Sequence, residues 1–182
     1  MRTQYYTATS IDGFIADRDN SLDWLLQFGD GDDDVYKKFI AEVGAIAMGS
    51  TTYEWIVNHH INADADHPRP WMYSQPSWVF SSRELPAIAD ADVRFVRGDV
   101  RPVHAAMTEA AAGKNIWVVG GGDLAGQFHD HGLLDELILG VAPVSLGGGA
   151  PLLPRTITKG MRLTEVRQEG PFALLSYRLE RG

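Results

Sequence analysis

Short apolar runs alternate along the chain with segments whose apolar residues recur at helical spacing. The runs predict strands over Thr3–Thr9, Ala45–Met48, Trp78–Phe80, Val93–Val96, Ile116–Val119 and Leu137–Ala142. Helical spacing predicts helices from Val35 to Val43, from Ser50 onward, over Val103–Ala112 and from Gly122 to about His129. Strands that alternate with helices predict a largely parallel sheet with helices on both faces.

The polar segments complete this pattern. Ser10–Trp24 is predicted to be a loop, because Asp12-Gly13 and Asp19-Asn20 are turn signals, and Asn58–Pro76 is predicted to be a surface loop. Met161–Gln168 and Phe172–Leu179 predict a closing antiparallel hairpin. Since no repeat or low-complexity linker interrupts the pattern, we expect one α/β domain over residues 1–182.

Charge and composition narrow the possible functions. Acidic residues outnumber basic ones by 24 to 16, which disfavours nucleic acid as a partner. The sequence has no cysteine, so disulfides, thiolate nucleophiles and zinc–thiolate sites are excluded, and its histidines show no metal-binding spacing. No stretch approaches the ~20 apolar residues of a membrane span, and the first residues do not resemble a signal peptide. We therefore expect a cytoplasmic protein that does not associate with membranes.

The strongest local motif is a run of three glycines, Gly120–Gly122, between a predicted buried strand and a helix. Glycine lets the backbone approach a pyrophosphate, and a helix start offers unpaired N–H groups. The run matches the G-x-G-x-x-A variant of the Rossmann fingerprint. A true Rossmann domain is disfavoured, because the motif comes late and the next strand ends in Ala142-Pro143, without the acid that holds a ribose. A tight turn without a ligand remains the alternative.

Two further junctions follow strand ends. Gly49-Ser50-Thr51-Thr52 could hold a phosphate at a helix start or could simply cap that helix. Ser81-Ser82-Arg83 could hold a phosphomonoester or could be an ordinary exposed loop. Ligands of open α/β sheets bind at the carboxyl ends of strands, so one extended dinucleotide could contact all three junctions.

Several segments together resemble the dihydrofolate-reductase-like family, in the branch of the RibD C-terminal domain. These segments are Ala8–Ala16, Ser21–Trp24, Met48–Glu54, Trp117–Gly122, Gly132–Leu137 and Ala142–Leu152. The resemblance implies a three-layer α/β/α fold, a mostly parallel sheet with an antiparallel C-terminal strand, and NADPH lying over the carboxyl edge of that sheet. NADH is the alternative cofactor.

The same resemblance assigns cofactor contacts. Ala8 and Ile15 would contact the nicotinamide amide, Gly49 and Thr52 the pyrophosphate, and Ser81, Ser82 and Arg83 the adenosine phosphate. Gly120 and Gly121 would form a cis Gly-Gly peptide. The candidate cofactor site is completed by Ser50, Thr51, Val119, Gly122 and Leu124.

Two positions depart from the folate-reducing members of the family, which often carry Arg there. This chain has Ser50 and Asp123 instead, and both reduce positive charge near the phosphates. The departures leave Arg83, and after it Arg97, to supply a preference for NADPH over NADH.

Substrate contacts are predicted at Asp12, Trp24 and Trp55, although tryptophans at such positions are also common core residues. In folate reductases a catalytic carboxylate sits early in the first helix, and Asp34 falls near that position, with Asp32 and Asp33 as rivals. A buried carboxylate there would hold a pterin or pyrimidine amidine. The alternative is an acidic helix start that the helix dipole favours.

The resemblance implies an NADPH-dependent reductase acting on a planar nitrogen heterocycle or on a related carbonyl or imine substrate. Its first candidate substrate is 5-amino-6-(5-phosphoribosylamino)uracil of riboflavin biosynthesis, and dihydrofolate is the second. A non-catalytic dinucleotide-binding protein on the same fold is the alternative function. A homodimer is expected, with the apolar C-terminal strands as a possible interface.

Overall fold

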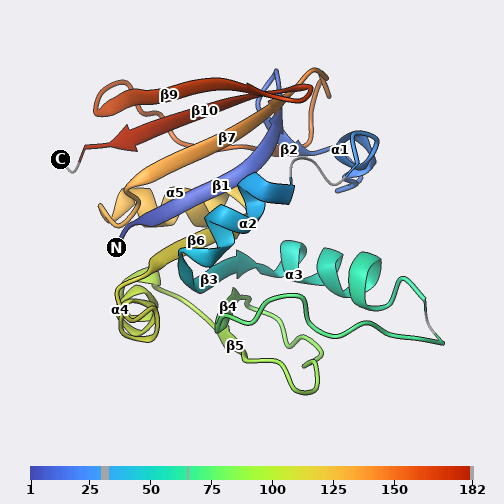
Figure 1. The fold of residues 1–182 in the computed structure, drawn as a ribbon. Coiled ribbons are helices and arrows are strands. Elements are labelled where there is room, and N and C mark those ends of the chain that lie inside the picture. The colour runs from blue at the N-terminus through green and yellow to red at the C-terminus, as the bar shows by residue number, and fades with distance from the viewer. Residues whose placement is uncertain (30–32, 65, 181–182) are drawn as a thin grey trace.

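One large sheet organises the protein. The structure, a computed structural model, describes residues 1–29, 33–64 and 66–180. Eight strands lie in the order β5-β4-β3-β6-β1-β7-β10-β9, and the pairs from β5 to β7 are parallel (Figure 1). Strand β10 runs antiparallel to both β7 and β9. The strands are β1 Thr3–Ser10, β3 Val43–Gly49, β4 Ser77–Phe80, β5 Val93–Val96, β6 Asn115–Gly120, β7 Glu136–Ala142, β9 Met161–Glu169 and β10 Phe172–Leu179.

Helices cover both faces of this sheet. They are α1 Asp23–Leu26, α2 Asp33–Ala41, α3 Ser50–Ile56 with the π-helical turn η1 Val57–Ile61, α4 Val100–Ala110 and α5 Gly122–Asp130. Figure 1 shows α2 in front of the sheet and α5 behind it. Of the helices that the structure describes, none combines the length and apolar character needed to cross a membrane.

Alternate residues of the central strands supply two separate cores. On β3, Ala45 and Ala47 pack with α4 and α5 on one face, whereas Ile46 and Met48 pack with α3 on the other. All four are fully buried. A strand that is covered on both sides needs apolar residues at every position, which explains the continuous apolar runs. The predicted three-layer α/β/α fold with an antiparallel C-terminal hairpin is therefore confirmed.

The segment predicted as a loop over Ser10–Trp24 differs from the prediction. It contains the short strand β2, Phe14–Ala16, which pairs with β8, Ala150–Pro151, and it also contains the start of α1. These elements have two to four residues, too few to show a periodic pattern. The pairing of β2 with β8 places the segment after β7 beside the end of β1.

Three other boundaries were predicted wrongly. Val43 begins β3 and does not end the helix before it. Helix α4 begins at Val100, because the Asp99 side chain accepts a hydrogen bond from the Arg101 N–H and Pro102 is tolerated in the first turn. The predicted loop over Asn58–Pro76 begins inside η1, which Ile61 anchors with a 5% exposed side chain.

Candidate active site

The three strand–helix or strand–loop junctions meet at one edge of the sheet. Strands β4, β3 and β6 are neighbours, so Ser81, Ser50 and Gly121 follow adjacent carboxyl ends. Arg83 Nη2 donates to Ser50 Oγ over 3.4 Å, which joins the first two junctions. A Cβ on Gly49 would lie 3.9 Å from both Gly120 O and Gly121 N, so the second junction abuts the third.

Each glycine of the triplet has a different environment. The Gly120–Gly121 peptide is cis, as the family resemblance implies. A Cβ on Gly120 would meet Thr52 Oγ1 at 3.1 Å, whereas one on Gly121 would have no atom within 4 Å. A Cβ on Gly122 would lie 2.2 Å from Pro151 O, so the start of α5 packs directly against β8. Gly121 alone of the three therefore faces open space.

That open space belongs to a cleft of about 470 Å³, here called the cofactor cleft. Its volume lies in the range of small-molecule sites. Trp55 lies on its wall and stacks on His59, with ring centroids 4.9 Å apart. The predicted site residues that line it are Ile15, Thr51, Thr52, Trp55, Val119, Gly120, Gly121 and Gly122.

Other predicted cofactor residues lie behind or beside this wall. The Leu124 side chain is 6% exposed and belongs to the core, so only its backbone could serve a ligand. Ser81 Oγ accepts from the Arg83 N–H and donates to the Arg83 carbonyl, which closes its own turn. Ser82 is exposed. Arg83 donates to both carboxylate oxygens of Glu54, at 3.0 and 2.7 Å.

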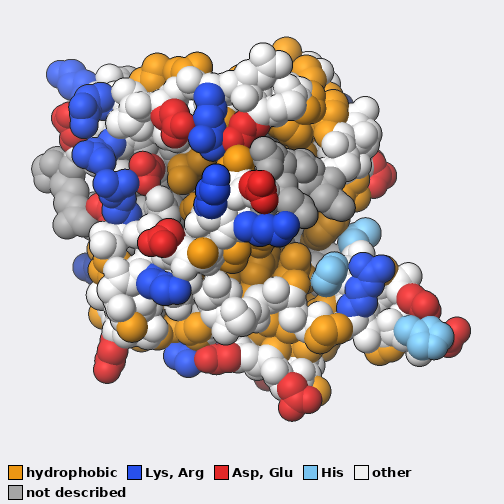
Figure 2. All heavy atoms as spheres, viewed as in Figure 1, with side chains coloured by type: hydrophobic (Ala, Val, Ile, Leu, Met, Phe, Trp, Pro, Cys, Tyr) orange, Lys and Arg blue, Asp and Glu red, His pale blue; other side chains and the backbone are white. Residues whose placement is uncertain are grey.

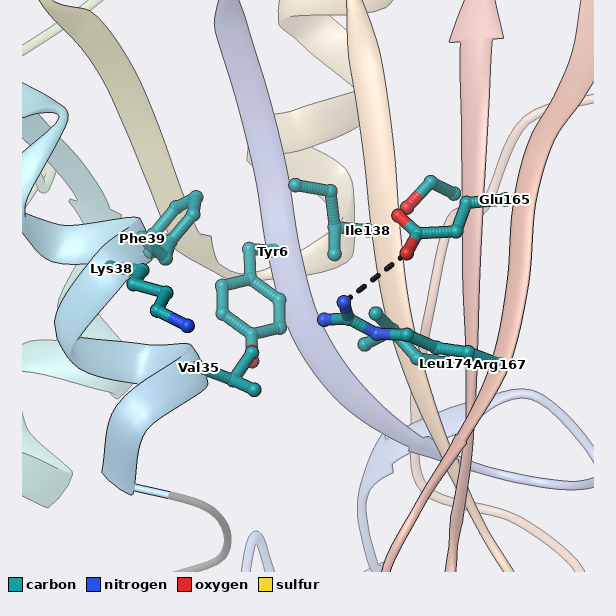
Figure 3. Close-up of a pocket in the computed structure, with 9 residues that line it drawn as sticks. Tyr6, Val35, Lys38, Phe39, Ile138, Glu165, Arg167 and Leu174 are labelled. Carbon is teal, nitrogen blue, oxygen red and sulfur yellow. Dashed lines mark ion pairs between the residues drawn. The ribbon is translucent and has the colours of Figure 1, made fainter.

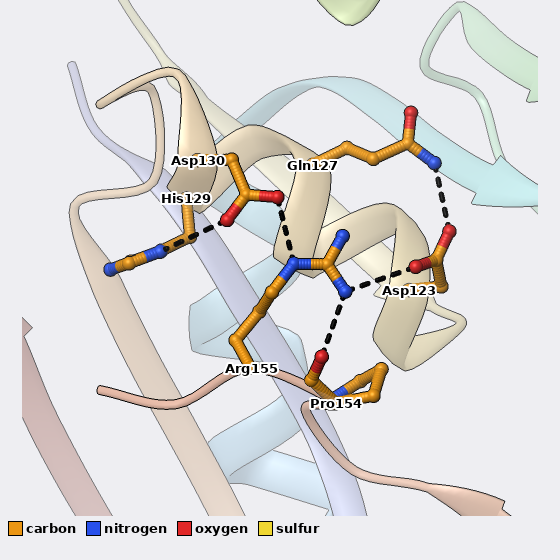
Figure 4. Close-up of polar contacts among 6 residues, drawn as sticks. All are labelled: Asp123, Gln127, His129, Asp130, Pro154 and Arg155. Carbon is orange, nitrogen blue, oxygen red and sulfur yellow. Dashed lines mark hydrogen bonds and ion pairs between the residues drawn. The ribbon is translucent and has the colours of Figure 1, made fainter. Parts of the chain in front are cut away.

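Asp123 departs from the family pattern, and its negative charge is paired with a nearby cation, Arg155. Its Oδ1 lies 3.1 Å from Arg155 Nη1, and Gln127 donates to its Oδ2 over 2.9 Å (Figure 4). Arg155 also pairs with Asp130 at 2.7 Å. The bonds from Gln127 and Arg155 hold the pKa of Asp123 below its ordinary value. The carboxylate at the start of α5 is thus paired, although it lies on the wall of the cofactor cleft.

A second cleft, here called the aromatic cleft, adjoins the first. Its volume is about 800 Å³, and Tyr6, Thr7 and Trp117 line both clefts. Ala8, predicted to contact the nicotinamide, lies on this second wall. The Trp117 indole donates from Nε1 to the Tyr6 carbonyl over 3.0 Å, which fixes the shared wall.

The predicted substrate residues have varied surroundings. Trp24 is buried in α1, whereas its neighbours Leu25 and Leu26 line the aromatic cleft. Asp34 is exposed in the first turn of α2, so the buried carboxylate expected there is not found at this residue. Its rival Asp32 lies outside the described residues, and of Asp33 only the backbone is described.

Asp12 holds a loop in place. Its carboxylate accepts hydrogen bonds from the backbone N–H groups of Leu146 and Gly147, at 3.0 and 2.7 Å. The Ser10 hydroxyl and then the Leu146 N–H hold the pKa of Asp12 well below its ordinary value. These bonds join the segment after β1 to the segment that leads into β8. A substrate contact at Asp12 stays a prediction.

Replacing Asp12 is expected to lower stability in a pH-dependent way. Because the folded-state pKa is depressed, the charged form stabilises the fold above the unfolded pKa of about 3.9, and this contribution disappears as the pH falls through the folded pKa. Asp12→Asn should therefore lower the Tm at neutral pH, and the difference from wild type should shrink in acid. Thermal melts across pH measure this. A difference that does not change with pH would contradict the assignment.

Sequence reasoning missed several cleft residues. Tyr6 and Trp117 lie on both walls, and Glu169 and Phe172 lie on the wall of the aromatic cleft. Alternation on β1 could have identified Tyr6, because Tyr5 next to it points into the core on the opposite face. Glu169 gave no local signal, since its position depends on how the C-terminal hairpin pairs with β7.

Comparison with known proteins agrees with this architecture. A family model described as the RibD C-terminal domain matches residues 3–175. YwjB of Bacillus subtilis (strain 168), named as an uncharacterized protein, is 32% identical over 177 residues, which cover 97% of each chain.

Solved structures show the same fold. A protein named "Putative riboflavin biosynthesis protein" from Shewanella sp. PV-4 superposes with a TM-score of 0.81 at 26% identity, with both chains fully covered. The diaminohydroxyphosphoribosylaminopyrimidine deaminase/5-amino-6-(5-phosphoribosylamino)uracil reductase of Thermotoga maritima gives a TM-score of 0.63 at 16% identity. The match covers 98% of this chain and 56% of the Thermotoga maritima protein. The chain belongs to the RibD C-terminal domain family.

Proposed function

We propose that this protein is an NADPH-dependent reductase that transfers a hydride to a pyrimidine-like or pterin-like substrate, at the heterocycle or at a carbonyl or imine group attached to it. The observation that carries the proposal is the pair of adjoining clefts. One cleft lies at the glycine turn, the other is lined by aromatic side chains, and the two share Tyr6, Thr7 and Trp117. A hydride donor and an acceptor ring could therefore meet at a common wall.

The residues of the cofactor cleft fit a dinucleotide. Gly121 leaves a space that a Cβ would fill, and backbone can approach a pyrophosphate there. Thr51 and Thr52 would offer hydroxyl and backbone donors at the start of α3. NADPH held there would supply the hydride for the reduction, and solvent would supply the accompanying proton. The chain's own contribution would be to position the two partners against the shared wall.

Turnover tests the proposal directly. The first substrate to examine is 5-amino-6-(5-phosphoribosylamino)uracil, which the name of the Thermotoga maritima neighbour contains, and dihydrofolate is the second. Substrate-dependent loss of NADPH absorbance is the expected result. NADPH binding without turnover on a panel of pterins, uracils, flavin precursors and quinones would favour the non-catalytic alternative. Absence of binding by NADPH and NADH at millimolar concentration would overturn both functions.

The proposal includes a cytoplasmic homodimer without nucleic acid or membrane partners. Strand β9 is at the edge of the sheet, and its Leu163 and Val166 side chains are 50% and 62% exposed. A second copy would cover these side chains. Sedimentation equilibrium measures the oligomeric state, and a monomer at high protein concentration would contradict this part of the proposal.

Arg83 is expected to set the cofactor preference. It follows β4 beside the start of α3, where a phosphate on the adenosine would compete with Glu54 for its guanidinium. Arg83→Ala should raise the Kd for NADPH about tenfold and leave the Kd for NADH within about twofold. Nicotinamide fluorescence titrations measure both constants. Arg97→Ala tests the second candidate, and Arg94→Ala, whose guanidinium stacks on Trp78 and pairs with Asp92, is the control.

A further inference from the structure

Neutral side chains form most of the wall of the cofactor cleft. Helix α3 leads from the glycine turn along this wall, and Trp55 and Ile56 line the cleft near the end of the helix. Tyr73, in the segment before β4, lines the cleft as well. Figure 2 shows basic and acidic side chains interleaved over the face that carries α2. Among the described residues that line the cleft, by contrast, Asp123 is the one charged side chain, and it is paired with Arg155.

Tyr73 is held on this wall by its ring and not by its hydroxyl. The ring packs edge to face against Trp117 and Trp71, with centroids 5.6 and 5.5 Å apart and interplanar angles of 87° and 78°. Within the part of the chain that the structure describes, the hydroxyl has no hydrogen-bond partner, and its oxygen is not among the enclosed polar atoms. Tyr53 also contacts Trp71, but its hydroxyl donates to the Pro86 carbonyl. The Tyr73 hydroxyl is thus open to a ligand.

This hydroxyl lies near the boundary between the two clefts. Burial raises the pKa of Tyr73, and the Tyr36 hydroxyl raises it further, so the two hydroxyls are within electrostatic reach of each other. Tyr36 lines the aromatic cleft, and its ring centroid lies 6.1 Å from that of Trp117. Tyr73 and Tyr36 therefore flank the indole that both clefts share. The raised pKa keeps the Tyr73 hydroxyl protonated at neutral pH, so that it can donate a hydrogen bond.

Tyr6 also lines the cofactor cleft, but its hydroxyl has different surroundings. Figure 3 shows the Tyr6 side chain between α2 and the C-terminal hairpin, in a groove that Lys38 and Arg167 also line. Burial raises the pKa of Tyr6, and the charge of Glu169 raises it further. The Tyr6 hydroxyl thus lies among the charged side chains of this groove, whereas that of Tyr73 is left to a ligand of the cofactor cleft.

Reduction of a carbonyl or imine group needs a donor of this kind. Hydride addition to the carbon of C=O or C=N moves the π-electron pair onto the oxygen or nitrogen, which then takes a proton from solvent. Negative charge builds up on that atom while the hydride is transferred. A hydrogen-bond donor that is already in position stabilises this charge and lowers the barrier.

Resting on the proposed function, we propose that Tyr73 is a catalytic residue of the reduction. Its hydroxyl donates a hydrogen bond to the carbonyl oxygen or imine nitrogen of the acceptor, beside the Trp117 indole that the two clefts share. The class of substrate that follows is an uncharged planar ring with a conjugated C=O or C=N group, in the ring or attached to it. The hydroxyl keeps its own proton throughout.

A spectroscopic probe tests the hydrogen bond without turnover. The NADP⁺-saturated protein is titrated with para-dimethylaminobenzaldehyde, whose absorption moves to longer wavelength when its carbonyl oxygen accepts a hydrogen bond. The bound aldehyde should absorb at shorter wavelength in Tyr73→Phe than in wild type, and its Kd should rise about fivefold. The Kd of para-dimethylaminotoluene, which lacks the carbonyl, should stay within about twofold. An unshifted spectrum in the variant, or failure of wild type to bind the aldehyde at millimolar concentration, overturns the inference.

Single-turnover kinetics test the catalytic role. With NADPH in place of NADP⁺, loss of nicotinamide fluorescence measures hydride transfer to the aldehyde. Tyr73→Phe should lower this rate at least about 100-fold, because it removes the donor. The Kd for NADPH should stay within about twofold of wild type, since the variant keeps the ring and its packing.

Tyr53→Phe is the matched control, because it removes a hydroxyl beside the same Trp71 but outside both clefts. This variant should keep the wild-type spectrum of the bound aldehyde and the wild-type rate, although loss of its bond to Pro86 should lower the Tm. Equal rates in Tyr73→Phe and wild type overturn the catalytic role and leave the reductase function intact. A wild-type protein that shows the spectral shift but never consumes NADPH supports the hydrogen bond of Tyr73 and overturns the proposed function.

Discussion

Gly121→Val is expected to raise the Kd for NADPH at least about 100-fold and to leave a folded protein. A Cβ at Gly121 meets no atom within 4 Å, so the new side chain would project into the cofactor cleft without disturbing its neighbours. The backbone conformation at this residue, with φ -75° and ψ 165°, is extended and open to any side chain. The loss of binding would therefore come from obstruction of the cleft.

Nicotinamide fluorescence measures the affinity, and far-ultraviolet circular dichroism verifies the fold. Gly140→Ala on β7 is a suitable control, because its nearest neighbour would be Phe172 Cδ1 at an ordinary 3.8 Å and it does not line the cofactor cleft. NADPH binding by Gly121→Val at the wild-type affinity would place the cofactor elsewhere.

Substitution of the next residue, Gly122, should instead reduce the stability of the fold. A Cβ on Gly122 would lie 2.2 Å from Pro151 O and 2.5 Å from Leu152 O, both backbone atoms. The Leu152 segment cannot retreat freely, because its N–H donates to the Gly13 carbonyl and its carbonyl accepts from Tyr5 Oη. Gly122→Ala is therefore expected to lower the free energy of unfolding by about 2 kcal/mol or more.

Urea unfolding of Gly122→Ala and of Gly121→Ala compares the free energies of unfolding of two variants in the same turn. Gly121→Ala adds the same methyl group in open space, so its free energy of unfolding should stay within roughly 0.5 kcal/mol of wild type. If both variants are equally stable, the contact between α5 and β8 is looser than the structure shows.

The parts of the molecule that could be predicted from the sequence are those with a continuous local signal. The strand, glycine run and helix around Gly120–Gly122 follow each other directly, so their pattern identified a turn that the structure places on the cofactor cleft. The runs that became β3, β4 and β6 were also recognisable, because strands buried on both faces are apolar throughout.

The parts that could not be predicted depend on contacts between distant residues. Strand β8 exists because Gly149, with φ +133°, lets the chain pass against the Ala16 carbonyl, where a Cβ would come within 2.0 Å. Asp12 reaches the same segment across more than 130 residues of sequence. Glu169 had the appearance of a turn residue, and only the pairing of the hairpin with β7 brings it to the aromatic cleft.

The Trp117 indole lines both clefts and is therefore an intrinsic fluorescent probe of ligand binding. Trp117 is held by its bond to the Tyr6 carbonyl and touches both clefts, so its emission should change when either one fills. The chain contains four other tryptophans, and the spectrum of Trp117→Phe subtracted from that of wild type would isolate this signal. The order in which the cofactor and the substrate bind could then be measured in real time from this fluorescence, without an added label.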